Sequence, residues 1–600
     1  MDDQNKNLIL ATGLSFMVIL MWFLLFPPAD VPPPATATLA EQAAATAEQA
    51  AAAADAIAGT DTAAAAEVAA EIPRIRIDTP DLSGSISMAG GRIDELALKR
   101  YPQTLEPGSP TVNLLTPVGT EHAYYALYGW TPAGDLSFDA VPGPNTQWSV
   151  ASGDTLAPGK PVGLTWDNGA GLVFSRQVAV DEHYLFTVTD SVQNNTAAEV
   201  RLAPYGLIAR HGQPKTQKIW VLHEGIVQMS DGELKETDYP DMPDFEVVAR
   251  EGTPAEVVEV AKDGWIGFTD AYWMTVLAPM PGQAFTAVTK YVPASDVYQT
   301  ETRMPTMAVA PGGKAEMQSR LFAGAKEWEA IRAYQDNQKI DRFIDSIDWG
   351  WFFFLTKPIF WLLHMLHGLI GNMGLAIIGL TLFLKALLFP LAYKSYISMA
   401  RMKELQPEME ALKEKCGDDR AKLQQETMKL YKDKKVNPAA GCLPILPQIP
   451  IFFSLYKVIF VTIELRQAPF FGWIRDLSVP DPSSILNLFG LLPYATPEAG
   501  SLFAIVSLGV LPILLGISMW LQMRLNPAPT DPTQAAIFAW MPWIFMFMLG
   551  SFASGLVIYW IGNNTITFIQ QYIIMRSHGH HPKVFGTILP GFRRKKPLPK

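Results

Sequence analysis

Long apolar stretches with almost no charge are the feature that most constrains this fold. Leu8–Phe26 is a run of 19 uncharged residues, enough for a helix that crosses a hydrocarbon layer of about 30 Å. Five more apolar stretches follow residue 370: Met373–Tyr393, Gly441–Ile463, Leu502–Met523, Ala535–Phe552 and Ser554–Tyr572. Backbone groups inside a bilayer must be satisfied within the helix. The sequence therefore predicts an α-helical membrane core with six spans.

Two apolar segments admit a second interpretation. Residues 1–26 resemble a cleaved secretion signal, but the apolar run exceeds the roughly 7–15 residues of such signals, so we interpret this segment as a transmembrane anchor. Trp349–Ile370 mixes aromatic residues with Lys357 and two histidines. That mixture favours an amphipathic helix in the membrane interface, within residues 335–372, over a span.

Basic residues predict the orientation of the spans. Lys394–Lys435 contains 11 Lys and Arg, and Arg576–Lys600 contains seven with no acidic residue. The Arg466–Ser501 loop contains only two. Loops rich in Lys and Arg stay in the cytoplasm, so both termini are expected there. We expect an inner-membrane protein with a large domain outside.

The soluble segments differ in composition and in hydropathy pattern. Residues 27–73 are rich in Ala and Pro and are expected to form a linker. Residues 74–334 contain short alternating apolar runs between turn residues, which predicts an all-β sandwich that ends in a helix at Ala323–Tyr334.

The basic loop at 396–435 is predicted to form a helical hairpin. Its apolar residues recur every three or four positions, at Met402, Leu405, Met409 and Leu412. A solvated linker pair and a hairpin that docks a partner both fit this pattern.

Lys385 is the residue of greatest interest because it lies inside an apolar stretch. A charge at the bilayer centre costs about 2.5–3.5 kcal/mol on insertion scales, so such a residue faces protein or water. A structural ion pair is one interpretation, but the five clustered stretches contain no acidic residue apart from Glu464, directly at the end of Gly441–Ile463. We favour a hydrated groove, which other polar residues of these stretches can help to line: Thr381, Gln448, Gln522, Asn563 and Asn564.

Enzyme signatures are missing from the sequence. It has no phosphate-binding loop, no H-E-x-x-H and no G-x-S-x-G motif. Two cysteines exclude a disulfide framework, and histidines at 578, 580 and 581 are interpreted as incidental rather than as a metal site. We expect no enzymatic activity, cofactor or metal, and the net charge of −11 argues against sequence-specific binding of nucleic acid.

Several motifs resemble the YidC/Oxa family of membrane protein insertases. The longest is Val436–Tyr456, which reads VNPAAGCLPILPQIPIFFSLY. Shorter ones occur at Asn372–Ala376, Ser398–Lys403 and Ser554–Tyr559. The outer segment is similar to the Gram-negative branch of the family through Leu82–Ile86, Gly90–Asp94 and Ser346–Gly350.

The resemblance implies a five-helix core at 373–574 around a hydrophilic groove, with a β-supersandwich domain outside. It implies insertion and folding of inner-membrane proteins, alone or beside the Sec translocon. The groove cation of the family is usually Arg, and Lys385 occupies that position here, which keeps the charge but loses the bidentate fork. Thr381 and Trp560 match positions that face substrates.

The expected partners are nascent membrane proteins, the lipid bilayer, the Sec translocon and the ribosome. Contact with the ribosome is expected through the hairpin and through the basic tail at 575–600, whose phosphate attraction is salt-dependent. The tail's basic cluster is Arg593, Arg594, Lys595 and Lys596.

Two rival functions remain open at this point. A membrane-anchored, periplasmic carbohydrate-binding protein would explain a β-sandwich, but five clustered spans exceed the needs of an anchor. A small-solute transporter is disfavoured because internal repeats are missing.

Overall fold

The computed structural model describes residues 72–216, 222–417, 419–434, 436, 444–492, 507–526 and 532–579. The predicted anchor at 1–26, most of the linker at 27–73, the histidines at 580 and 581, and the four basic residues at 593–596 lie outside this part.

Residues 74–325 form two β-sheets, so the expectation of a large all-β domain is confirmed. The first sheet has 12 strands in the order β14-β15-β18-β19-β11-β5-β3-β2-β1-β7, with β20 paired to β11 and β4 to β3. Its strands are β1 Arg74–Asp78, β2 Leu82–Ser87, β3 Arg92–Pro102, β4 Thr111–Leu115, β5 Tyr124–Ala133, β7 Thr155–Leu156, β11 Val200–His211, β14 Val247–Val248, β15 Thr253–Val260, β18 Phe285–Val292, β19 Val297–Arg303 and β20 Met307–Val309.

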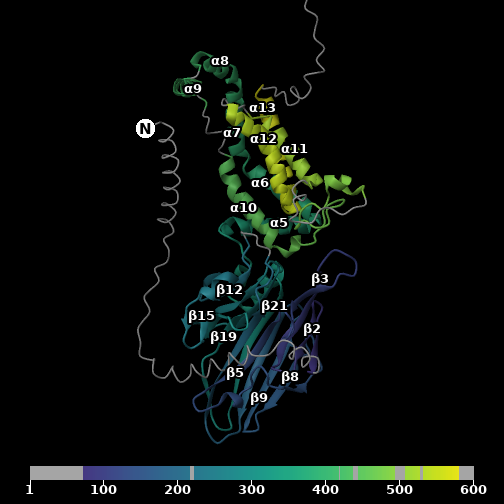
Figure 1. The fold of residues 1–600 in the computed structure, drawn as a ribbon, viewed down its shortest axis with the longest axis vertical. Helices are drawn as coiled ribbons and strands as arrows, with labels where there is room; N and C mark the ends of the chain where they lie inside the picture. Colours follow the sequence, from purple (N-terminus) through teal and green to yellow (C-terminus); the bar gives the residue numbers. More distant parts are fainter. Residues whose placement is uncertain are drawn as a thin grey trace, which may run out of the picture. The chain divides into compact units, whose positions relative to one another are not determined.

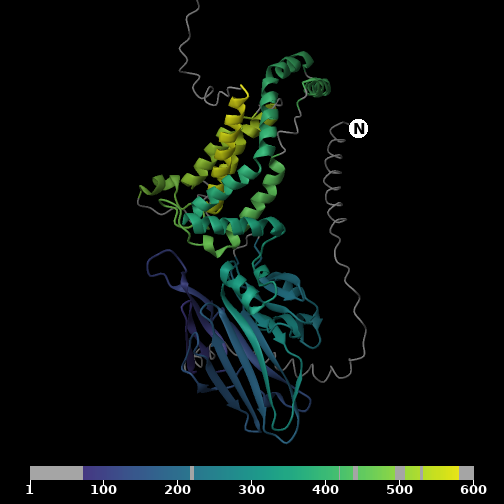
Figure 2. The ribbon, with the colours of Figure 1, turned by 180° about the vertical axis from the view of Figure 1, so that it is seen from behind.

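The second sheet has nine strands in the order β13-β12-β16-β17-β21-β10-β9-β8-β6. Figures 1 and 2 show its long strands running beside one another from both sides. The strands are β6 Ser149–Ser152, β8 Val162–Asp167, β9 Leu172–Val180, β10 Leu185–Asn194, β12 Gly225–Ser230, β13 Glu233–Asp238, β16 Gly264–Thr269, β17 Trp273–Pro279 and β21 Lys314–Ala325.

Side chains that alternate along each strand form the core of the domain. Every second residue of β9, from Leu172 to Val180, is buried, as expected for a strand with one face on a core. Arg176 falls on that buried face and pairs with Asp190, which lies directly opposite on β10, at 2.7 Å from Nε to Oδ1. A charge that the pattern forces inside is thus compensated by its cross-strand neighbour.

The helix after the domain starts later than expected. Helix α4 spans Trp328–Gln338, whereas the sequence predicts a helix from Ala323. Residues up to Ala325 instead complete β21, where Trp273 of β17 pairs with Ala325. Strand pairing outweighs the helix propensity of this Ala-rich stretch.

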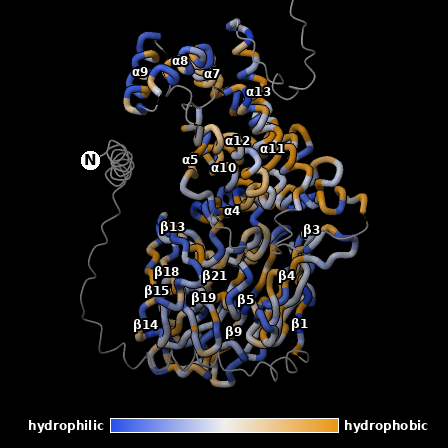
Figure 3. The backbone as a smooth tube through the Cα atoms, turned by 45° about the horizontal axis from the view of Figure 1, so that its top comes forward, coloured by the Kyte–Doolittle hydropathy of each residue, from blue (hydrophilic) through white to orange (hydrophobic). Residues whose placement is uncertain are grey.

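The remaining chain is helical: α5 Phe353–Ile370, α6 Met373–Leu387, α7 Phe389–Glu404, α8 Gln406–Cys416, α9 Arg420–Asp433, α10 Ile445–Val461, α11 Val510–Met523, α12 Pro532–Met548 and α13 Ser554–Ser577. Figure 3 shows α10 and α12 mainly in apolar colours and α8 and α9 mainly in polar ones.

Helix length bears on the predicted spans. Among the described helices, α5 alone is long and apolar enough to cross a membrane, and α6 with α7 passes as one span bent by 70°. Shorter apolar helices occupy Leu446–Val461, Val510–Met523 and Ala535–Ser551. The count of six spans stays a prediction, as does the interfacial position of α5.

The predicted span at Met373–Tyr393 is not one continuous helix. The chain bends at Leu388, because Pro390 in the first turn of α7 has no N–H to continue the helix. Helix α7 then runs to Glu404, so the hairpin of α8 and α9 begins later than residue 396.

Candidate functional site

A polar cluster from three apolar helices contains the predicted groove cation. Lys385 lies in the last turn of α6, and its Nζ donates to Oε1 of Gln448 on α10 at 3.5 Å. Nε2 of Gln448 donates to the hydroxyl of Tyr559 on α13 at 2.5 Å. We call Lys385, Gln448 and Tyr559 the polar triad. The triad joins one cation, one amide and one phenol across three helices.

Lys385 has no carboxylate partner within the described residues, since no ion pair to it occurs there. Its side chain is half-buried. A half-buried ammonium held only by a long amide contact keeps donor capacity, because Lys has three N–H groups. The cluster can therefore accept an anionic or polar group that enters between the helices.

No hydrogen bond joins the other predicted groove residues to the polar triad in the described part of the chain. The Thr381 hydroxyl donates to the Ile377 carbonyl at 2.7 Å and is buried. Asn564 of α13 donates to Ser518 of α11 at 3.1 Å, which makes it a helix–helix contact. Asn563 keeps a buried Oδ1 without a partner among the described residues, and Gln522 on α11 is half-buried.

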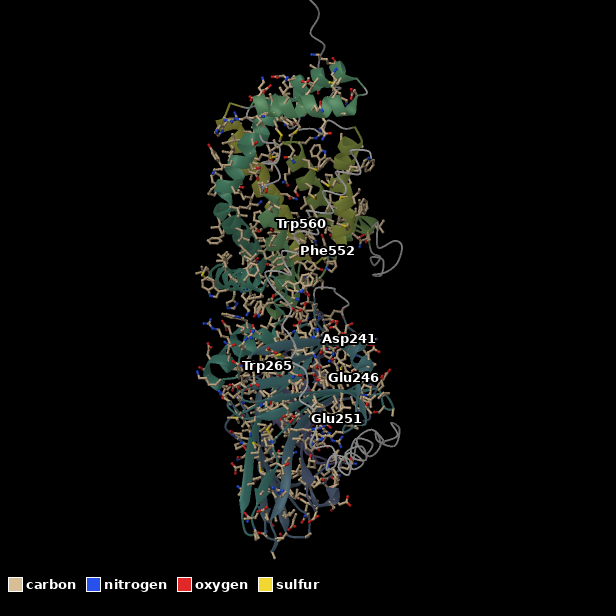
Figure 4. All side chains as sticks on the ribbon, turned by 90° about the vertical axis from the view of Figure 1, so that its left-hand side faces the viewer. Asp241, Glu246, Glu251, Trp265, Phe552 and Trp560 are labelled. Carbon is tan, nitrogen blue, oxygen red and sulfur yellow. The ribbon has the colours of Figure 1, made fainter. Side chains whose placement is uncertain are left out.

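Trp560 follows Tyr559 of the triad in sequence and lies in the helical region of the molecule (Figure 4). Its ring centroid is 5.2 Å from that of Phe452 on α10 and 5.9 Å from that of Phe545 on α12. These contacts place an aromatic wall between α10, α12 and α13. Trp560 is half-buried, so part of its ring is accessible.

The hairpin buries only a narrow apolar seam. Leu405 and Met409 are buried, whereas Met402 and Leu412 are half-buried. The Tyr431 hydroxyl of α9 contacts Sδ of Met409 at 3.3 Å. Most of the remaining hairpin surface is exposed, which leaves room for a partner.

Two residues of functional interest, Tyr559 and Lys457, were not predicted from the sequence. Tyr559 is the last residue of the Ser554–Tyr559 motif, but it carries no charge that distinguishes it from its neighbours. Lys457 lies in the apolar α10 and is buried against Asp348, with which it forms an ion pair. A Lys in an apolar stretch is the same signal that singles out Lys385. The partner of Lys457, Asp348, lies in the Ser346–Gly350 motif.

Comparisons with known proteins follow the same division of the chain. The family model described as "YidC periplasmic domain" matches residues 74–362, and "60Kd inner membrane protein" matches residues 365–581. A protein of Dinoroseobacter shibae named membrane protein insertase YidC is 64% identical over 100% of this chain and 99% of its own length. Its namesake from Ruegeria pomeroyi is 63% identical over 99% of both chains, and that of Paracoccus denitrificans is 58% identical over 98% of this chain and 97% of its own.

Proposed function

Because the chain belongs to the YidC family of membrane protein insertases, we propose that its polar triad receives the polar segments of membrane proteins during insertion. Members of this family insert proteins into membranes, and this is the function of the chain. The inner membrane is the corresponding location, with residues 74–325 as the periplasmic domain.

One observation carries the proposal: a cation without an acidic partner in the described chain stands among apolar helices. Attraction between unit charges 4 Å apart is about 4 kcal/mol at an effective dielectric constant of 20, against about 1 kcal/mol in water. A carboxylate of a substrate would gain part of that energy beside Lys385. The cost of moving its polar segment into the bilayer falls accordingly.

The apolar part of the substrate needs a separate path. Trp560 offers an accessible ring beside the triad, so we assign it to contact with the substrate. Exposed apolar residues of α12, such as Trp540 and Ile544, would then face lipid. Transfer into lipid is driven by burial of apolar surface and requires no covalent step.

Photocrosslinking tests the assigned path. A photoreactive phenylalanine derivative at Trp560 is expected to crosslink to a ribosome-stalled single-span protein. The matched control places the same derivative at Trp540, which is 67% exposed. This variant is expected to crosslink mainly to lipid. Crosslinks to the nascent chain from position 540 but not from 560 would refute the path.

The membrane arrangement is also proposed. Six spans, cytoplasmic termini and α5 lying in the outer interface are supported by the Lys and Arg distribution and by exposed aromatics of α5. The hairpin and the tail would contact the ribosome, and the Sec translocon would assist with some substrates. Deleting residues 591–600 should weaken ribosome co-sedimentation at low salt if the tail contributes.

The carbohydrate-binding alternative is not favoured. Relatives named as insertases match this chain from end to end, so its membrane helices cannot be treated as a simple anchor.

A further inference from the structure

A cavity of about 760 Å³ lies where the start of α5, helix α10, strand β13 and the residues just before β12 meet. Aromatic side chains form much of its wall: Trp349, Trp351, Phe352, Phe353 and Phe453. Phe352 and Phe453 stack with their ring centroids 6.3 Å apart. Charged side chains also line the cavity, so it combines an apolar wall with polar ends.

Most of the lining charges are paired. Asp348 pairs with Lys457, and Asp238 is 2.8 Å from Nδ1 of His223. Arg342 and Lys357 both bind the single carboxylate of Asp345, at 2.7 and 2.5 Å. Two cations that share one carboxylate leave a positive charge in excess at that end.

Glu236 is the lining acid without such a partner. Glu236 is an exposed residue that lines the cavity, and no hydrogen bond or ion pair joins its side chain to another residue in the described ranges. Partial desolvation at the cavity wall, followed by the nearby Asp348 carboxylate, raises the pKa of Glu236, and the charges of His223, Lys457 and Lys326 offset part of this rise. A bound cation would relieve both effects.

Exposed aromatic side chains at the edge of the cavity suit a membrane surface. Trp351 is 86% exposed and Phe353 is 55% exposed, and both line the cavity. Tryptophan and other amphipathic aromatics favour the headgroup region of a bilayer. The cavity therefore offers an excess positive charge, an unpartnered carboxylate and an apolar exit.

We propose that this cavity holds the headgroup of a phospholipid that carries both a phosphate and an ammonium group. The ammonium lies at Glu236 beside the aromatic wall, where ring faces add cation–π attraction. The phosphate lies at Arg342 and Lys357, and the acyl chains leave over Trp351 and Phe353. This assignment rests on the interfacial position of α5 proposed above.

An anionic lipid without an amine fits this site less well. Its phosphate would bind Arg342 and Lys357. The rest of its headgroup would lie at the Glu236 carboxylate without a positive charge to pair with it. Charge complementarity therefore selects for a zwitterionic headgroup.

Lipid binding to the purified full-length protein tests the assignment without any insertion assay, so its failure is separate from failure of the proposed function. The probes are dihexanoyl phosphatidylethanolamine and dihexanoyl phosphatidylglycerol, with binding followed by native mass spectrometry. The wild type is expected to bind the ethanolamine lipid about tenfold more tightly, which corresponds to about 1.4 kcal/mol. Glu236→Gln should remove this preference, whereas Glu233→Gln, an exposed acid of the same strand outside the cavity lining, should keep it.

A second variant and a third probe make the test decisive. Lys357→Gln should weaken binding of both lipids, because the two share the phosphate. Unchanged preference in Glu236→Gln would overturn the ammonium assignment, and equal binding of phosphatidylglycerol to the wild type would do the same. Glycerophosphoethanolamine binding as tightly as the lipid would overturn the claim that the ligand is a lipid.

Discussion

At the scale of single residues, Lys457 and Asp348 show how a buried charge is held in an apolar setting. Asp348 accepts from the backbone N–H of His223 at 2.8 Å and of Gly350 at 3.1 Å, besides pairing with Lys457. Gly350 has a φ of +68°, and a Cβ on it would lie 3.3 Å from Cε of Lys457. Glycine therefore suits this turn for its conformation and for its space.

Removing one member of this pair should cost more than removing both. Lys457→Met leaves the Asp348 carboxylate buried without its cation, and loss of one partner of a buried pair costs about 3–5 kcal/mol. The double variant Lys457→Met with Asp348→Leu should recover part of that loss, although two backbone N–H groups lose their acceptor. Thermal unfolding of the purified protein in detergent measures both. Equal destabilisation by the single and the double variant would contradict the pairing.

Sequence patterns identified single residues unevenly. The sequence singles out Lys385 because its charge is conspicuous in an apolar stretch, and Gln448, which it contacts, was among the polar residues expected near it. Thr381 and Asn564 were also expected in the groove, but the Thr381 hydroxyl bonds to its own helix and Asn564 pairs with Ser518. Helical position decides which way a polar side chain faces, and a polar residue in a sequence does not reveal its neighbour.

At the scale of elements, tertiary contacts and proline set the boundaries that periodicity leaves open. The apolar pattern continues through Leu388, but Pro390 divides it into α6 and α7, bent by 70°. Ala323 to Ala325 read as helix, yet β17 offers them hydrogen-bond partners. The existence of strands and helices was predictable from sequence, whereas their ends depend on partners far away in the chain.

The hairpin gives a direct test of orientation. Cys416 is half-exposed at the end of α8, in the loop whose basic residues predict a cytoplasmic position. In a Cys442→Ser background, a membrane-impermeant maleimide should label Cys416 in inverted vesicles and not in intact spheroplasts.

A matched control fixes the opposite side. Thr120→Cys, placed on an exposed turn of the β-domain in a chain without the two native cysteines, should label in spheroplasts instead. Labelling of Cys416 from outside intact spheroplasts would reverse the proposed topology.

At the scale of the whole molecule, the chain combines an all-β periplasmic domain with a helical membrane region. The sequence predicted this division because a change from alternating runs to long apolar stretches is visible in composition alone. It could not predict the polar triad, because Gln448 and Tyr559 are 111 residues apart and meet only when their helices pack. Nor could it reveal the cavity beside α5, whose lining comes from three separate segments.

The most direct test of the account is insertion into liposomes that contain this protein and no translocon. Two short single-span substrates, with an Asp or an Asn in the segment to be translocated, are synthesised against them and scored by protease protection. Lys385→Ala should lower protection of the Asp substrate about fivefold, close to 1 kcal/mol in the barrier, and affect the Asn substrate less. Lys385→Arg should keep most activity, and Lys160→Ala, an exposed lysine of the β-domain, should match the wild type. Equal protection of both substrates by Lys385→Ala and the wild type would contradict a role for the cation in insertion.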